Sequence, residues 1–159
     1  MTYSVKRLTD SDVALLRQLL AVFGKAFNEL DTYQGKVPSR GYLKALLGKE
    51  HFLVVVAMEG DSVTGGLTAY VLDKFEQERK EIYIYDLAVS AEHRRRGIAT
   101  KLINYLREIA KEIGAYIIFV QADKGDAAAI RLYESLGTAE DVYNFDIAVN
   151  PDSQIPPAA

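Results

Sequence analysis

The sequence predicts a single α/β domain with a mixed, mostly antiparallel central sheet and helices on both of its faces. Three observations support this prediction. The chain has 159 residues, which is the length of one domain. Its composition, 49% hydrophobic and 26% charged, is that of an ordinary globular protein. Its pattern runs from a helical N-terminal layer through adjacent strands to alternating strands and helices. We expect the domain to cover residues 1–149.

The first part of the chain is predicted to be helical. A cluster of N-cap residues at 9–12 precedes apolar residues at helical spacing, which predicts one helix over 12–30. Gly35 then interrupts the chain. Ser39 can cap a short second helix that ends at Gly48.

The middle of the chain is predicted to form strands. A continuous apolar run over 52–58 and a second run over 63–72 are separated by a turn, which predicts a hairpin. Residues 73–80 form a charged connection, and the next strand covers 81–89. The remaining elements are expected as a helix from 98 that ends at Gly114, a buried strand over 116–121, a helix over 127–136, a final strand over 142–149 and a disordered tail over 150–159.

Composition excludes several classes of function. The chain has no cysteine, which excludes disulfides and thiolate chemistry, and its two histidines argue against a metal site. No apolar run reaches the roughly 20 residues that span a bilayer, and the N-terminus lacks the pattern of a signal peptide, so we expect a cytoplasmic protein without a membrane partner. A net charge of −3 gives no reason to expect nucleic acid as a partner.

The most informative segment covers residues 81–100. A strand leads through three consecutive arginines into Gly97, where a helix begins. The first N–H groups of a helix have no partner within it, and the helix dipole adds positive charge, so this arrangement favours a phosphorylated ligand. The spacing Arg-x-x-Gly-x-Ala differs from that of P-loops and dinucleotide folds. The alternative is a solvated basic loop.

Asp86 lies within an otherwise apolar strand and therefore needs an explanation. It can form a structural pair, or it can hold a substrate ammonium group and help to remove its proton. Strand alternation places it on one face with Ile82, Ile84 and Ala88, although a bulge would change this phase.

Other carboxylates are candidates for binding a cationic substrate. Acidic loops are usually only solvated, and Asp126 can simply cap the helix that follows it. Residues 28–34 can line the cleft in which this cationic substrate would bind. The candidates for substrate binding are Asp123, Asp126, Asp146 and Glu81, with Glu76 and Glu78 as weaker ones.

Two motifs together resemble those of the GCN5-related N-acetyltransferase (GNAT) superfamily. Arg94-x-x-Gly97-x-Ala99 resembles its pyrophosphate loop, and residues 132–137, Leu-Tyr-Glu-Ser-Leu-Gly, resemble its later Leu-Tyr-x-x-Leu-Gly helix. This resemblance spans roughly residues 3–149 and implies the GNAT fold with acetyl-CoA as acetyl donor. It implies that Tyr133 protonates the departing thiolate; the alternative is a packing tyrosine. The implied acetyl-CoA contacts are the backbone of Leu87, Ala88 and Val89, and the turn formed by Arg94, Arg95, Arg96, Gly97, Ile98, Ala99 and Thr100.

A closer resemblance is to the type I aminoglycoside 3-N-acetyltransferases. It rests on residues 69–72, 74–77, 81–89, 92–95, 97–100, 120–123 and 145–147, which include loop and surface positions. It implies acetyl transfer to the 3-amino group of an aminoglycoside. The alternatives are another amine as acceptor (a polyamine, a small metabolite or a protein amine) or a non-catalytic acyl-CoA-binding module. Pairing through the final strand could yield a homodimer.

Overall fold

The computed structural model describes residues 2–152. The chain divides into two compact units, Met1–Gln121 and Ala122–Ala159. Most of the tail predicted to be disordered, from residue 153 onward, lies outside the described residues. Within residues 2–152, no helix is long and apolar enough to cross a membrane. In the same range, no three His, Cys, Asp or Glu side chains gather in a way that could hold a metal ion.

The first unit contains a five-stranded sheet in the order β1-β2-β3-β4-β5. Neighbouring strands are antiparallel, except that β4 and β5 are parallel. The predicted fold class, α/β with a mixed, mostly antiparallel sheet flanked by helices, is therefore confirmed. The strands are β1 (Ser4–Arg7), β2 (Phe52–Glu59), β3 (Ser62–Lys74), β4 (Arg79–Val89) and β5 (Ala115–Val120).

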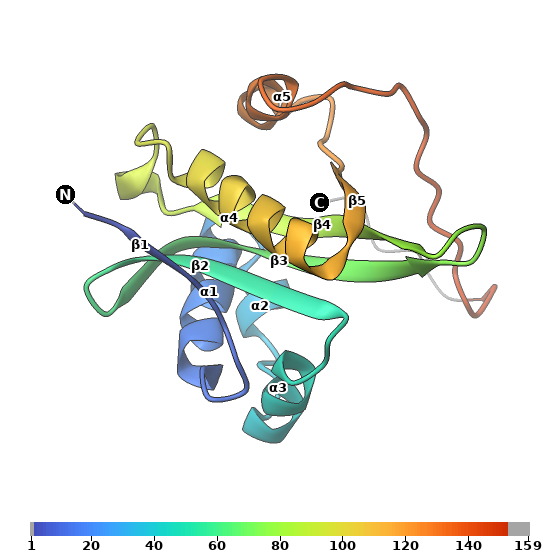
Figure 1. Ribbon diagram of the computed structural model, residues 1–159. Coiled ribbons are helices and arrows are strands. Elements are labelled where there is room, and N and C mark those ends of the chain that lie inside the picture. The colour runs from blue at the N-terminus through green and yellow to red at the C-terminus, as the bar shows by residue number, and fades with distance from the viewer. Residues whose placement is uncertain (1, 153–159) are drawn as a thin grey trace. The chain divides into compact units, whose positions relative to one another are not determined.

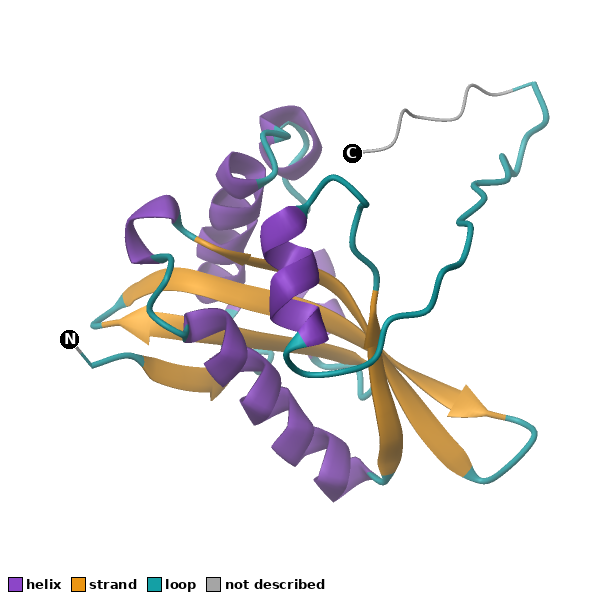
Figure 2. Ribbon diagram, turned by 90° about the horizontal axis from the view of Figure 1, so that it is seen from above, coloured by secondary structure: helices purple, strands orange, loops and turns teal. Residues whose placement is uncertain are grey.

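Helices cover both faces of this sheet. Figure 1 shows α1 (Val13–Ala26), α2 (Leu30–Gln34) and α3 (Arg40–Leu47) on one face and α4 (Ile98–Ile113) on the other. The core on the first face joins apolar side chains of α1 and α3 to those of the sheet, namely Leu16, Leu19, Phe23, Leu43, Leu47, Phe52, Val54, Val56 and Ala88. The β3–β4 hairpin projects beyond the helices (Figures 1 and 2).

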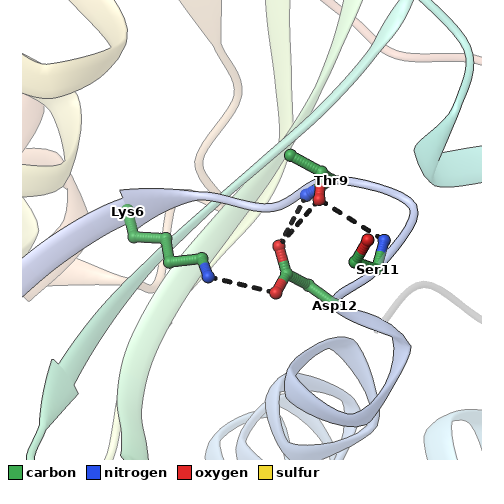
Figure 3. Close-up of polar contacts among 4 residues, drawn as sticks. All are labelled: Lys6, Thr9, Ser11 and Asp12. Atoms are coloured by element: carbon green, nitrogen blue, oxygen red, sulfur yellow. Dashed lines mark hydrogen bonds and ion pairs between the residues drawn. The ribbon is translucent and has the colours of Figure 1, made fainter.

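The predicted cap cluster lies at the start of α1 (Figure 3). Asp12 is the N-cap residue, but its carboxylate accepts hydrogen bonds from the backbone N–H of Thr9 (2.8 Å) and from the Lys6 ammonium (3.0 Å). The side chain of Ser39 accepts a hydrogen bond from the Tyr42 N–H (3.1 Å), so the predicted cap of α3 is confirmed. The Ser39 hydrogen bond fixes where the chain enters α3, whereas the Asp12 side chain makes no cap hydrogen bond to α1.

The prediction of one helix over 12–30 is wrong. α1 ends at Ala26, and Asn28 adopts a left-handed backbone conformation with φ of 54°. The chain then turns and resumes as α2, whose C-cap is Gly35. Apolar residues keep their helical spacing across the break, so periodicity alone could not reveal it.

Several strands also differ from expectation. β1 was not predicted, because its four residues are mostly polar and exposed and it depends on pairing with β2. β3 and β4 extend into the expected connection 73–80, where Asp73 pairs with Lys80. β5 is not buried as predicted: Tyr116 and Ile117 are 48% and 46% exposed. Within residues 2–152 it pairs only with β4, so part of its apolar surface lacks cover.

The second unit contains α5 (Ala127–Glu134), followed by chain without regular secondary structure. The strand predicted over 142–149 is absent. Its alternating apolar residues favour a strand, but a strand forms only where another edge supplies hydrogen-bond partners. No strand within residues 2–152 pairs with this segment, and Tyr143, Phe145 and Ile147 are 88%, 80% and 88% exposed.

Candidate active site

A β-bulge in β4 shapes the centre of the candidate site. Ile84 pairs with Ala69 of β3, whereas Asp86 pairs with Thr68, the very next residue along β3. Tyr85 is therefore the extra residue of the bulge. A bulge changes which face of the sheet the following residues point to.

Because of this bulge, Asp86 does not share a face with Ile82 and Ile84, and the change of phase that the sequence left open has occurred. Asp86 contacts Tyr33 of α2, and Ala88 belongs to the core beneath α1 and α3. Alternation along β4 before the bulge puts Ile82 and Ile84 on the opposite face, which α4 covers (Figure 1). Asp86 thus faces the layer formed by α1–α3.

Tyr33 is the direct partner of Asp86. Its hydroxyl donates a hydrogen bond to Asp86 Oδ1 over 3.2 Å. The ring of Tyr33 packs against Phe23 and Phe27, with centroids 5.9 and 5.7 Å apart, so its position is fixed by the core. Burial raises the pKa of the Asp86 carboxyl, the Tyr33 hydrogen bond lowers it, and the charge of Glu29 raises it. Sequence reasoning did not single out Tyr33, which lies 53 positions away in the chain.

The break between α1 and α2 forms an open hollow with a volume of about 470 Å³. It is lined by five consecutive residues, Asn28, Glu29, Leu30, Asp31 and Thr32. The expectation that residues 28–34 can line a cleft is consistent with this position. The hollow carries the carboxylates of Glu29 and Asp31, so its chemistry suits a cation.

The far half of β4 has a free edge. β5 pairs with β4 only from Lys80 to Ile84, and the last pair joins Ile84 to Val120. Residues 86–89 pair with β3 on one side and have no strand partner on the other within residues 2–152. The backbone of Leu87–Val89, predicted to bind pantetheine, therefore has an edge that can hydrogen-bond an extended ligand.

The arginine turn joins the end of this strand to α4. Arg94 Nε donates a hydrogen bond to the Val89 carbonyl over 3.1 Å, and Arg95 adopts a left-handed conformation with φ of 63°. Arg96 donates to the Tyr3 hydroxyl over 2.7 Å. Gly97 is the N-cap of α4 with φ of 74°, a left-handed conformation that a glycine adopts readily.

The turn fits an anionic group. No side chain caps this end of α4, and an added Cβ at Gly97 would meet nothing within 4 Å among the described residues. The first N–H groups of the helix, here those of Ile98, Ala99 and Thr100, are left without partners inside it. Unpaired donors next to the open side of Gly97, with arginines beside them, suit a pyrophosphate.

Glu81 lies in a charged cluster at the opposite end of β4. It accepts a hydrogen bond from the Tyr116 hydroxyl and lies 3.7 Å from the Lys74 ammonium. Glu76 pairs with Lys74 and Arg79. These contacts support the structural interpretation of both carboxylates, and a role in substrate binding stays a prediction.

The other candidates lie in the second unit. Asp126 is the N-cap of α5 and accepts a hydrogen bond from the Ala129 N–H over 3.1 Å, which is the capping role weighed from the sequence. Asp146 is contacted by Asn144 (3.4 Å), and Asp123 precedes α5. Burial and the charge of Asp126 raise the pKa of the Tyr133 hydroxyl, which stays protonated at neutral pH. Roles for these side chains in catalysis or binding stay predictions.

Comparison with protein families gives a match over most of the chain. A family model described as the acetyltransferase (GNAT) family matches residues 16–138. An uncharacterized N-acetyltransferase of Methanocaldococcus jannaschii is 31% identical over 144 residues, which are 87% of this chain and 62% of that protein. N-acetyltransferase 8B of Rattus norvegicus is 29% identical over 82 residues, 52% of this chain and 37% of that protein. The chain thus spans less than two thirds of these relatives.

Solved structures give matches over nearly the whole chain. An aminoglycoside acetyltransferase from an uncultured soil metagenomic sample is 51% identical, with a TM-score of 0.93 over 94% of this chain and 100% of that chain. A second aminoglycoside acetyltransferase from such a sample, solved in complex with sisomicin, is 33% identical, with a TM-score of 0.86 over 93% and 97% of the two chains.

Proposed function

Because the chain belongs to the acetyltransferase (GNAT) family, we propose that it transfers the acetyl group of acetyl-CoA to an amine of an aminoglycoside. One observation carries this proposal. Asp86 lies at the point where β4 leaves β5, on the same strand that leads into the arginine turn. The proposed proton acceptor and the proposed binding surface for the acetyl donor thus lie within fifteen consecutive residues, 86–100.

The residues that hold acetyl-CoA are proposed as follows. The arginine turn and the first N–H groups of α4 bind the pyrophosphate, and the free backbone edge of Leu87–Val89 binds the pantetheine. When bound, acetyl-CoA supplies a thioester carbonyl that an amine can attack. The protein's part is to fix this group beside Asp86 and to receive the protons that the reaction moves.

Asp86 acts on the acceptor. An aminoglycoside amine is an ammonium group at neutral pH and must lose a proton before it can attack. Asp86 holds the ammonium through charge and accepts that proton, directly or through water. The neutral nitrogen then forms a bond to the carbonyl carbon, and the carbon–sulfur bond breaks with its electron pair leaving on sulfur. The nitrogen loses a second proton as the amide forms, and this loss balances the proton that the thiolate takes up. Burial raises the pKa of the Asp86 carboxyl toward that of a useful base.

The thiolate needs a proton, and Tyr133 is the proposed donor. Its residue type and position match the tyrosine of the family's Leu-Tyr-x-x-Leu-Gly helix. With its pKa raised, the hydroxyl is protonated at working pH and can act as an acid.

Two observations support an aminoglycoside as the acceptor. The sequence resembles the type I 3-N-acetyltransferases at loop and surface positions, and the similar solved structures include two proteins described as aminoglycoside acetyltransferases. The 3-amino group is the position that the resemblance implies. The carboxylates of Glu29, Asp31 and Asp86 suit an acceptor with several ammonium groups.

A thiol-release assay tests this proposal. Purified protein with acetyl-CoA is offered sisomicin, gentamicin, spermidine and a peptide with a free N-terminus, and free thiol is measured. We expect release with the aminoglycosides and resistance when the protein is expressed in a sensitive host. Thiol release with only the polyamine or the peptide would show that the acceptor is that amine and not an aminoglycoside. Binding of acetyl-CoA without release for any amine would indicate a non-catalytic module.

A further inference from the structure

An aromatic stripe crosses the sheet beside Asp86. It consists of one ring from β2, one from β3, two from β4 and one from β5: Phe52, Tyr70, Tyr85, Tyr83 and Phe119. Neighbouring ring centroids lie 5.3 Å apart between Phe52 and Tyr70 and 5.9 Å apart between Tyr70 and Tyr85. Tyr83 lies 5.8 Å from Tyr85 and stacks on Phe119 at 4.8 Å.

The sheet register holds this stripe in place. Phe52 is directly opposite Tyr70, Tyr70 is opposite Tyr83, and Tyr83 is opposite Phe119. Residues opposite one another point to the same face, which here is the face of α1–α3. Tyr85 is the bulge residue, and its ring packs against Tyr70 and Tyr83 on that face. The bulge that turns Asp86 toward this face therefore also completes the stripe.

Most of the stripe is not core. Phe52 is 7% exposed at its covered end, whereas Tyr70 and Tyr85 are 39% and 62% exposed and Phe119 is 36% exposed. The core aromatic Phe23, by comparison, is 1% exposed. Contiguous exposed aromatic rings of this kind mark a surface that takes a ligand.

The charges around the stripe select a cation. Burial raises the pKa of the Tyr70 and Tyr83 hydroxyls, and the neighbouring Tyr85 hydroxyl and the charge of Asp86 raise it further. Asp86 therefore acts on both rings, and Glu29 acts on Asp86. The cations at the hairpin end of this face, Lys74 and Arg79, are held by Glu76 and Glu81.

We propose that the aromatic stripe is the surface on which the polycationic amine acceptor binds, with an ammonium group against the faces of Tyr85 and Tyr70 and its charge balanced by Asp86. This inference rests on the proposed transfer to an amine. Ammonium groups over aromatic rings are attracted by the negative ring faces, most strongly where carboxylates lie nearby. The stripe thus positions the amine that Asp86 deprotonates.

Calorimetric titration of the full chain with sisomicin and with spermidine, in the presence of CoA, tests the stripe. We expect Tyr85→Leu to weaken the affinity for both amines about 3- to 30-fold. Tyr85→Phe, which keeps the ring, restores the affinity. Phe75→Leu is the matched control, because Phe75 is an aromatic residue of the same hairpin, 99% exposed and outside the stripe. CoA binding and thermal midpoint are measured for each variant to verify folding.

The outcomes separate the stripe from the proposed function. Equal affinities for wild type and Tyr85→Leu, or a loss in Tyr85→Phe as large as in Tyr85→Leu, would overturn the stripe while acetyl transfer to aminoglycosides could still stand. If wild type transfers no acetyl group to sisomicin, the proposed function fails. The spermidine titration then still shows whether the stripe binds a polycationic amine. Absence of binding of both amines to wild type would overturn the stripe as well.

Discussion

Three features of Asp86 bear on its role. It points away from the face that the strand pattern predicts, it accepts a hydrogen bond from Tyr33, and burial raises its pKa. An acid whose pKa is higher in the folded than in the unfolded protein binds more protons when folded, between its unfolded and folded pKa values. The stability of the fold therefore decreases as the pH rises through that window.

This direction of the pH dependence leads to a prediction for the variant Asp86→Asn. At pH 7.5 the amide removes a half-buried charge, so we expect a thermal midpoint equal to or above that of wild type. The difference should disappear below the unfolded pKa of the carboxyl. Turnover should fall about 100- to 10,000-fold, with CoA affinity unchanged, because a general base is lost. Normal turnover, or a loss of stability at pH 7.5, would instead assign Asp86 a structural role.

The pair Tyr33→Phe and Glu29→Gln tests how the pKa of Asp86 is set. Tyr33→Phe removes a hydrogen bond that lowers this pKa, so the acid limb of kcat/KM should move to higher pH. Glu29→Gln removes a charge that raises the pKa, so the limb should move to lower pH. Tyr105→Phe on α4 is the control and should leave the limb in place. Shifts in the same direction for the two variants would contradict the assignment of the limb to Asp86.

At this scale the sequence indicated Asp86 and the arginine turn as candidates but did not reveal the surroundings of Asp86 in the fold. An acidic residue in an apolar strand is visible as an anomaly in the chain itself. The contact with Tyr33 joins residues 53 positions apart, and the bulge at Tyr85 depends on the register with β3. Neither leaves a local pattern.

At the scale of elements, the N-terminus of α4 is where local backbone geometry and binding meet. Gly97 begins this helix and Gly114 ends it, both in the left-handed region with φ of 74° and 79°. An added Cβ would meet no atom within 4 Å at either position among the described residues. The two glycines therefore have similar backbone conformations, but only Gly97 lies at the end of α4 where the pyrophosphate is proposed to bind.

Substituting each glycine by alanine separates stability from binding. Each variant should lose about 1 kcal/mol of unfolding free energy, from placing a Cβ in a left-handed conformation. Only Gly97→Ala should also weaken acetyl-CoA binding, measured by calorimetry, because its Cβ occupies the space over the first helical N–H groups. Equal CoA affinity in the two variants would show that the pyrophosphate does not bind at this turn.

Elements with strong local signals were predicted well. The helix after Gly97, the β2–β3 hairpin and the helix capped by Ser39 each carry their own periodicity and capping residues. The elements that were not predicted depend on strand pairing or on a break in a helix. β1 forms only because β2 offers it an edge, and the break at Asn28 leaves the apolar spacing intact. The alternating residues over 142–149 show the reverse case, a strand pattern without a strand partner in the described chain.

At the scale of the whole molecule, charge and topology separate two kinds of surface. The net charge is −3, but three adjacent arginines lie just before α4. Their positive charge suits an anionic donor. Asp86 and the aromatic stripe lie on the sheet face toward α1–α3, Glu29 and Asp31 lie at the break between α1 and α2, and these groups suit a cationic acceptor. β4 connects the two surfaces, because its free edge lies between the bulge and the arginine turn.

The most direct test of the central claim is the structure of the product. Wild-type protein is incubated with acetyl-CoA and sisomicin, and the product is isolated and analysed by mass spectrometry and two-dimensional NMR. We predict one added acetyl group, on the 3-amino nitrogen, and almost none with Asp86→Asn. Recovery of unmodified sisomicin, from protein that binds acetyl-CoA and acetylates a different amine, would contradict it.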